Sequence, residues 1–244
     1  MKKIVNVVIL FLLMFSLSSC SNIKNYKNEV SAEEFNAYSN KLTSYNFDRD
    51  FELQQVITLD SKQIIEGIDS VTGEITSKMN MKTHHKVDFD KKLIREEANN
   101  SSESTTKTAN ETTTNKEKGN MNSFYQYDGN IYKQYVVETK SFNVTTSFEN
   151  VVKKLTLFLD VDFEKKDEIK YFIDGDVYTI EVIIDDVKAV VQTTIKDDSI
   201  NLVTKISGTF SLDLITTEFN INAELTYDFK NINLDVEDVS EYEQ

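Results

Sequence analysis

Few residues of this sequence could bind a metal ion. His84 and His85 are its only histidines, and neighbouring residues of a strand point to opposite faces, so the pair cannot ligate one ion at ordinary strand geometry. Asp160, Asp162 and Glu164 would share a face and could offer carboxylate oxygens to Ca²⁺. The glycine and the ligand spacing of an EF-hand loop are missing, however, and a charged strand edge is the commoner explanation. We therefore predict no metal site and no cofactor.

Signatures of catalysis are also scarce. The sequence contains no G-x-S-x-G elbow, no Walker loop and no dinucleotide glycine fingerprint. Asp174 and Asp176 flank Gly175, where turn chemistry already accounts for both carboxylates. A carboxylate pair for glycoside hydrolysis stays open because acidic residues are abundant, but the aromatic residues follow strand alternation rather than forming a platform. We predict that the protein is not an enzyme and has no catalytic residues.

The remaining reactive group is the thiol of Cys20, the only cysteine. A lysine pair precedes the apolar run 4–15, which is too short to cross a bilayer core that needs about 20 helical residues. Charge, apolar block and small residues in this order describe a secretory signal. The motif LSSC, 17–20, resembles a bacterial lipobox. This resemblance implies that residues 1–19 are a lipoprotein signal peptide and that Cys20 carries the acyl chains, such as palmitate, of a lipid anchor.

The anchor predicts where the protein resides. Two or more acyl chains hold a protein stably on a membrane, so we expect a domain anchored to the cell membrane that faces the extracytoplasmic side, with residues 20–30 as a polar tether. A cleaved signal with a chance cysteine, or a buried structural thiol, is the alternative. Without a second cysteine the fold has no intramolecular disulfide.

Charge and composition narrow the range of partners. The chain has 244 residues and a formal net charge of −14, and such acidity repels phosphate backbones, which excludes nucleic acid as a partner. It also disfavours docking on anionic lipid, so the anchor must provide the membrane contact. The absence of proline and tryptophan and the presence of only two arginines are typical of AT-rich coding in a low-GC bacterium.

Two helices are predicted from apolar spacing. Ser31 and Glu34 fit a capping box ahead of apolar residues at helical intervals, which predicts a helix over 31–45. The segment 147–160 repeats apolar residues with a helical period and has an acidic residue near its start, which predicts a second helix.

The rest of the chain alternates with period two. Phe51, Leu53, Gln55 and Ile57 share one side of the first such run, and the segment 219–229 alternates most clearly. Asp-Gly pairs predict tight hairpin turns within the segments 124–135 and 171–182. We therefore predict a mainly β (α+β) fold within one domain, 31–244. Its core would be a single curved antiparallel sheet, or half-barrel, with about two helices packed on the concave face.

One internal segment breaks this pattern. Residues 98–120 contain almost no apolar side chain that could offset the entropy lost on ordering. We predict a flexible loop inserted between strands; a linker between two domains is the alternative.

The order of these features resembles the LolA/LppX-type lipoprotein half-barrels. A lipobox, an early helix, long antiparallel strands, one mid-chain helix and the ending ELTYDFKNINLDVEDVSEY, 224–242, match that layout, although the proline usual near the family's end is missing. The resemblance implies an alternating strand, a polar turn and a short closing strand in this ending. It also implies a concave face that holds a lipid or acyl chain beneath the helices.

The function implied is non-catalytic binding or carriage of a lipid or other apolar ligand by a cell-surface lipoprotein. Residues expected to line the cavity are Val151, Leu155, Phe158, Phe219, Ile221, Leu225 and Tyr227. A packed core uses the same residue types. The alternative is therefore a surface protein with a solid interior that binds an unknown protein partner.

Overall fold

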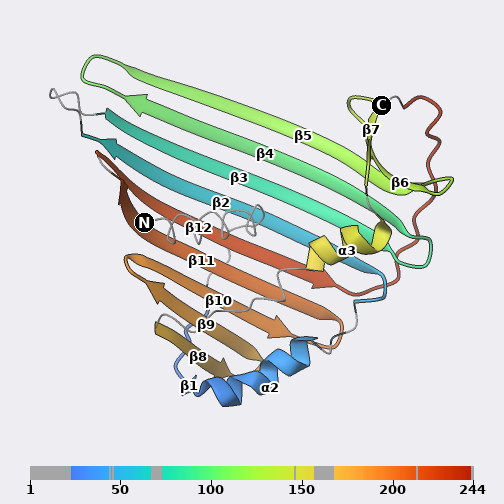
Figure 1. Cartoon of the computed structure of the whole chain (residues 1–244), viewed down its shortest axis with the longest axis horizontal. Coiled ribbons are helices and arrows are strands. Elements are labelled where there is room, and N and C mark those ends of the chain that lie inside the picture. Colours follow the sequence, from blue (N-terminus) through green and yellow to red (C-terminus); the bar gives the residue numbers. More distant parts are fainter. Residues whose placement is uncertain are drawn as a thin grey trace.

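The computed structural model describes residues 23–43, 45, 47–66, 73–145, 147–156, 168–212 and 214–242. These residues form one sheet of twelve strands and two helices (Figure 1). Each pair of neighbouring strands is antiparallel, and the strand order runs from one edge to the other without closing. The prediction of a mainly β fold built on a single open antiparallel sheet with two helices is confirmed.

The bounds of the elements follow the chain. The described helices are α2 (Ala32–Thr43) and α3 (Phe148–Thr156). The strands are β1 (Glu29–Val30), β2 (Phe51–Ile65), β3 (Gly73–Asp88), β4 (Leu93–Lys107), β5 (Thr112–Asp128), β6 (Ile131–Val136), β7 (Ser141–Val144), β8 (Glu168–Asp174), β9 (Val177–Ile184), β10 (Val187–Ile195), β11 (Ser199–Leu212) and β12 (Ile215–Asp228).

The sheet is built from two meanders that meet in its middle. Strands β2 to β7 follow one another to one edge, and the chain then returns to the other edge, where β8 to β12 lead back to the centre. There β12 pairs with β2 over its whole length. At the predicted hairpins, Gly129 and Gly175 adopt φ of 60° and 64°, a conformation that glycine reaches without strain.

Both helices begin where the sequence predicts. The Ser31 backbone N–H donates to the Glu34 carboxylate at 2.9 Å, and the Glu34 N–H donates to the Ser31 hydroxyl at 3.2 Å, which completes the capping box of α2. In α3 the Ser147 hydroxyl accepts the Asn150 N–H at 3.2 Å. Residues 157–160 of the second predicted helix lie outside the described part of the chain.

Strand alternation divides the sheet into an inner and an outer face. We call the face that packs against the helices the inner face. Its main core, the first apolar cluster, combines side chains of both helices with those of the sheet. It contains Phe35, Phe51, Leu53, Val87, Ile94, Tyr132, Phe148, Val152, Leu155, Val191, Ile195, Ile200, Leu202, Leu225, Tyr227 and Phe229. Figure 1 shows α3 crossing this face at the ends of β12 and β2.

The prediction of a loop over 98–120 is wrong. Residues 98–107 end β4 and residues 112–120 begin β5, and these strands pair from Ile94 opposite Tyr125 to Lys107 opposite Thr112, with only 108–111 outside a strand. Backbone hydrogen bonds do not depend on apolar side chains, and the many threonines favour extended structure. Hydroxyl contacts such as that between Thr105 and Thr114, 3.1 Å, add cross-strand interactions.

The described part of the predicted tether over 20–30 is hydrogen-bonded to the sheet. Residues 23–28, which we call the N-terminal strap, lie on the outer face. The Gln192 side-chain amide accepts from the Lys24 N–H and donates to the Lys24 carbonyl, both at 2.7 Å. The Tyr26 hydroxyl donates to Glu181 at 2.5 Å. Polar residues therefore attach this segment to the sheet through hydrogen bonds that a hydropathy pattern does not reveal.

The C-terminal segment also departs from expectation. Residues 229–242, the C-terminal strap, contain no strand among their described residues, in contrast to the short closing strand expected. After Phe229, which packs in the first apolar cluster, the strap continues over the outer face, where the Gln126 amide pairs with both the N–H and the carbonyl of Glu237 at 3.0 Å. The carboxylates of Asp50 and Asp88 accept further backbone N–H groups of the strap. Side chains thus replace the strand pairing expected for this segment.

Candidate ligand-binding site

The structure divides the residues predicted to line a cavity into two groups. Leu155, Leu225 and Tyr227 belong to the first apolar cluster and Val151 packs against it. Leu225 and Tyr227 are fully buried, and the Tyr227 hydroxyl donates to the carbonyl of Leu155 at 2.6 Å. Burial raises the pKa of this tyrosine. These four residues therefore join α3 to β12 as packed core.

The other group lies farther along β12. Ile221 belongs to a second apolar cluster and Phe219 packs against it. This cluster has Val182, Ala189, Ile206 and Ile221 as its buried members, with Leu59, Ile169, Ile180, Ile184, Val187 and Phe219 around them. Phe158, the seventh predicted lining residue, and the anchor residue Cys20 lie outside the described residues. The predicted lining is thus not one continuous surface.

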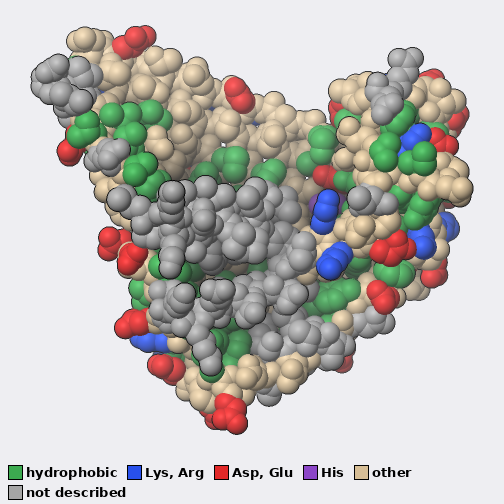
Figure 2. All heavy atoms as spheres, viewed as in Figure 1, with side chains coloured by type: hydrophobic (Ala, Val, Ile, Leu, Met, Phe, Trp, Pro, Cys, Tyr) green, Lys and Arg blue, Asp and Glu red, His purple; other side chains and the backbone are tan. Residues whose placement is uncertain are grey.

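The second apolar cluster continues toward the far ends of the strands. Within the described part of the chain, every residue of this cluster comes from a strand and none from a helix. Beyond it on the same face, Phe210 is 36%, Leu212 50% and Ile215 39% exposed. Figure 2 shows this face, with hydrophobic side chains near the far ends of the strands and acidic side chains mainly at the rim. On this half of the inner face the apolar side chains beyond the cluster are therefore exposed, whereas the buried members of the cluster are not.

A polar group interrupts the apolar inner face between β2 and β5. We call Gln55, His85, Glu96, Ser123 and Tyr125 the inner polar group. The register places His85 opposite Leu53 and Glu96, and Glu96 opposite Ser123. The Glu96 carboxylate accepts from the Tyr125 hydroxyl at 2.7 Å and from the Ser123 hydroxyl at 3.1 Å. These bonds fix the carboxylate.

Burial sets the protonation of this group. Desolvation lowers the pKa of His85, the charge of nearby His84 lowers it further, and the Glu96 charge opposes both. The imidazole is therefore neutral at pH 7, with Nε2 3.9 Å from the Glu96 carboxylate. Burial, followed by the Glu96 charge, raises the pKa of Tyr125.

Two buried side chains of the inner polar group have unused hydrogen-bonding atoms. Gln55 is 1% exposed, and both atoms of its amide lack a partner among the described residues. The Nδ1 atom of buried His85 is likewise unpartnered there. Sequence reasoning placed Gln55 on the apolar side of β2 without assigning it a role. The sequence did contain a signal for this role, because Gln55 is a polar residue at a position of β2 where the alternation calls for an apolar one.

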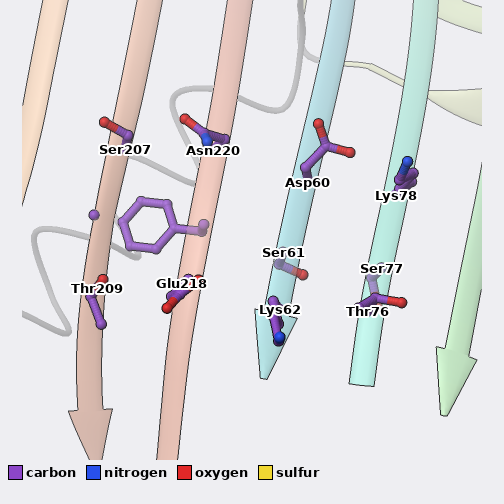
Figure 3. Close-up of a pocket in the computed structure, with 12 residues that line it drawn as sticks. Asp60, Ser61, Lys62, Thr76, Ser77, Lys78, Ser207, Thr209, Glu218 and Asn220 are labelled. Carbon is purple, nitrogen blue, oxygen red and sulfur yellow. The ribbon is translucent and has the colours of Figure 1, made fainter. Parts of the chain in front are cut away.

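The outer face carries hollows of a different character. Two shallow hollows of about 460 and 470 Å³ share Asp60 and Lys78 and are lined mainly by hydroxyl, amide and charged side chains. Figure 3 shows the first, with Asp60 on β2, Lys78 on β3 and Asn220 on β12. Ion pairs such as Lys62 with Glu74, 3.1 Å, cross this surface. It suits water and polar groups rather than an acyl chain.

Neither a metal centre nor a membrane-spanning helix is found in the described ranges. No three histidine, cysteine or acidic side chains gather there in a way that could hold a metal ion. The described helices are also too short and too polar to cross a membrane.

Comparison with known proteins yields distant structural similarities. The translocator domain of the autotransporter NalP from Neisseria meningitidis aligns with 81% of this chain and 94% of its own, at 8% identity and a TM-score of 0.34. A protein assigned as AttH from Nitrosomonas europaea aligns with 88% of this chain and 60% of its own, at 9% identity and a TM-score of 0.21. No protein-family model and no curated protein matches the chain. Similarity at this level carries no argument about function.

Proposed function

We propose that the protein is a cell-surface lipoprotein that binds or carries a lipid or other apolar ligand without catalysis. Acyl chains on Cys20 would anchor it to the cell membrane with the domain on the extracytoplasmic side. The observation that supports ligand binding is the second apolar cluster, which continues into partly exposed side chains at the far ends of β11 and β12. A contiguous apolar surface of this kind is typical of binding sites.

The contrast between the two faces supports this assignment of the inner face. The middle of the outer face is lined by residues such as Asp60, Lys78 and Asn220, which an apolar ligand would have to desolvate without compensation. On the inner face, Leu59 and Phe219 would lose water to an acyl chain at a gain of about 25 cal/mol per Å² of buried apolar area. The ligand would therefore lie on the inner face.

Binding is tested with a matched pair of substitutions in β12. Phe219→Glu would place a charge beside the second apolar cluster, and we expect it to weaken binding of an uncharged fluorescent apolar probe such as Nile red at least tenfold. Asn220→Glu puts the same charge one residue away on the outer face and should leave the affinity unchanged. Equal affinities for both variants and the parent protein would contradict ligand binding at this face.

The anchor is tested separately. Cells that express the full chain are labelled with a tagged fatty acid, and we expect the parent protein to be labelled and Cys20→Ala to be unlabelled. Persistent labelling of the variant would remove the proposed anchor, whatever the inner face binds.

A packed interior supports a second candidate, a surface protein that binds another protein. Leu155, Leu225 and Tyr227 fill the first cluster without leaving a lining. The edge strand β7, one side of which pairs with no other described strand, offers a partner its backbone and Val144, which is 59% exposed. Native mass spectrometry of protein purified from its own host separates the candidates. Co-purified acyl species support carriage, and a ligand-free protein supports the packed alternative.

A further inference from the structure

We infer that Gln55 and His85 bind the polar head of an uncharged, hydroxyl-bearing amphiphile, such as a monoacylglycerol, whose chain lies on the second apolar cluster. The inference rests on the proposed function, because it names the class of ligand that the inner face would take. It starts from hydrogen-bonding atoms that the described residues leave unused.

The buried amide of Gln55 is the main observation. An amide removed from water without a partner destabilises a protein, and buried polar groups are rarely left unbonded. Here neither Oε1 nor Nε2 has a partner within the described chain. An amide offers both a donor and an acceptor, which together match a hydroxyl group or a glycerol ester.

The other buried glutamines of the sheet show that Gln55 is exceptional. Gln126 and Gln192 are each 4% exposed, and each amide pairs with the N–H and the carbonyl of one residue in a strap. Each of these outer-face amides thus uses both its oxygen and its nitrogen, whereas neither atom of the Gln55 amide has a partner among the described residues. The Gln55 amide therefore has a donor and an acceptor that no described residue uses.

His85 supplies a second, adjoining contact. It lies opposite Leu53, two residues from Gln55 along β2, on the same face. Its imidazole is neutral because burial lowers its pKa, and its Nδ1 is free to bind within the described part of the molecule. The nearby Glu96 carboxylate, already fixed by Tyr125, repels an anionic head. Phosphate and carboxylate heads are therefore disfavoured relative to hydroxyl heads.

The register connects this head site to the apolar surface. Gln55 and Leu59 lie on the same face of β2, four residues and about 13 Å apart. Leu225 is opposite Gln55, and Ile221 is opposite Leu59. Leu59 and Ile221 both belong to the second apolar cluster. A molecule with its head at Gln55 would therefore have its chain directed along β2 and β12.

The test compares three ligands and a matched control. We measure binding of monoolein, phosphatidic acid with oleoyl chains and Nile red to the parent protein, Gln55→Leu, Gln55→Met and Thr217→Val. Thr217 is also buried, unpartnered among the described residues and on the inner face, but near the far end of β12. We expect the parent to prefer monoolein to phosphatidic acid.

The Gln55 variants should separate stability from binding. Removal of an unpartnered amide is expected to raise the midpoint of thermal unfolding by about 2–6 °C and to weaken monoolein binding by about tenfold to a hundredfold. Nile red binding should be unchanged. Thr217 lies beside the apolar surface proposed for the chain and not beside the head, so Thr217→Val should change the affinities for monoolein and Nile red alike. His85→Leu should weaken monoolein binding in the same direction.

Each contrary result has a distinct meaning. If Gln55→Leu and Gln55→Met bind monoolein as tightly as the parent, or if a crystal structure with monoolein shows the Gln55 amide bonded only to a buried water, the head site is wrong. If Nile red binds normally while the parent prefers phosphatidic acid, the head site is wrong and the proposed function survives. If neither Nile red nor monoolein binds the parent, both proposals fail.

Discussion

Single side chains hold the terminal segments of this protein on the outer face. Gln126 and Gln192 each bond both polar groups of one backbone residue, as a neighbouring strand would. Because these bonds are buried and concentrated in one side chain, they are more sensitive to substitution than a strand ladder.

We expect Gln126→Leu to lower the free energy of unfolding by about 1–3 kcal/mol, since the backbone groups of Glu237 lose their partners. Urea unfolding measures the change, and hydrogen exchange should show faster exchange in the C-terminal strap. Gln55→Leu is the control with the same substitution and the opposite expected sign. Equal losses in both variants would contradict this account.

An ion pair near the start of α3 makes stability depend on pH. The Lys92 ammonium donates to Glu149 at 2.7 Å, and this bond, with those from the backbone N–H of Glu149 itself and the Ser147 hydroxyl, lowers the pKa of Glu149 from 4.5 to about 2. A carboxyl whose pKa is depressed on folding stabilises the protein fully above its unfolded pKa.

The stability difference between the parent and Glu149→Gln should therefore be present at pH 6 and disappear as the pH falls from about 4.5 to about 2. Urea unfolding at several pH values measures it, and a titration of Glu149 followed by NMR measures the pKa directly. A difference that stays constant over this range would rule out the ion pair as its source.

At the scale of elements, the prediction succeeded where side-chain pattern alone determines structure. The capping box at Ser31, the Asp-Gly turns and the alternation of β12 each appear where expected. It failed where backbone pairing determines structure, as in β4 and β5, whose Ser, Thr and Asn residues extend the sheet. A polar sequence excludes a core of its own but does not prevent pairing with a neighbouring strand.

Strands β10 and β11 approach each other closely at Gly208. A Cβ atom at this position would lie 2.8 Å from the Asp186 carbonyl oxygen and 2.9 Å from the Val187 Cα, so the backbone would have to shift. We expect Gly208→Ala to destabilise the protein by about 1–3 kcal/mol. Gly73→Ala, whose Cβ would meet nothing closer than 3.9 Å, should be neutral or stabilising. Thermal unfolding compares the two, and similar midpoints would contradict the predicted clash.

At the scale of the whole molecule, the two straps fasten opposite flanks of the same sheet. The N-terminal strap bonds to β9 and β10, whereas the C-terminal strap covers β5 and β6. There Tyr242 packs edge-on against Phe124 and Tyr135, whose rings stack with centroids 5.0 Å apart. The first and last long strands, β2 and β12, pair with each other in the middle of the sheet.

Deletion of residues 231–244 should therefore uncover the Phe124 and Tyr135 rings and loosen β4 to β6 before the rest of the sheet. We expect a lower unfolding midpoint and faster hydrogen exchange confined to these strands. Uniformly faster exchange over all strands would show instead that the strap is required for the whole fold.

Of the candidate site, the sequence supplied the apolar residues but not their grouping. Phe219, Leu225 and Tyr227 share one face as their spacing predicts, yet Leu225 and Tyr227 pack beneath α3 and Phe219 lies beyond it. Where a helix packs along a strand depends on residues far apart in the sequence, and the spacing of apolar residues within the strand does not predict it. The outer-face bonds of Gln126 and Gln192 escaped prediction for the same reason.

The contact between Lys24 and Gln192 sets the reach of the proposed anchor. If acyl chains are attached at Cys20, four residue steps separate the lipid from the first point of attachment to the sheet, at most about 14 Å of extended chain. The domain would then lie close to the bilayer, with β10 as the strand nearest the lipid. Because Gln192 lies on the outer face, the apolar inner face would be on the opposite side of the sheet from this attachment, and exchange of a ligand with the membrane would require the domain to tilt about its anchor.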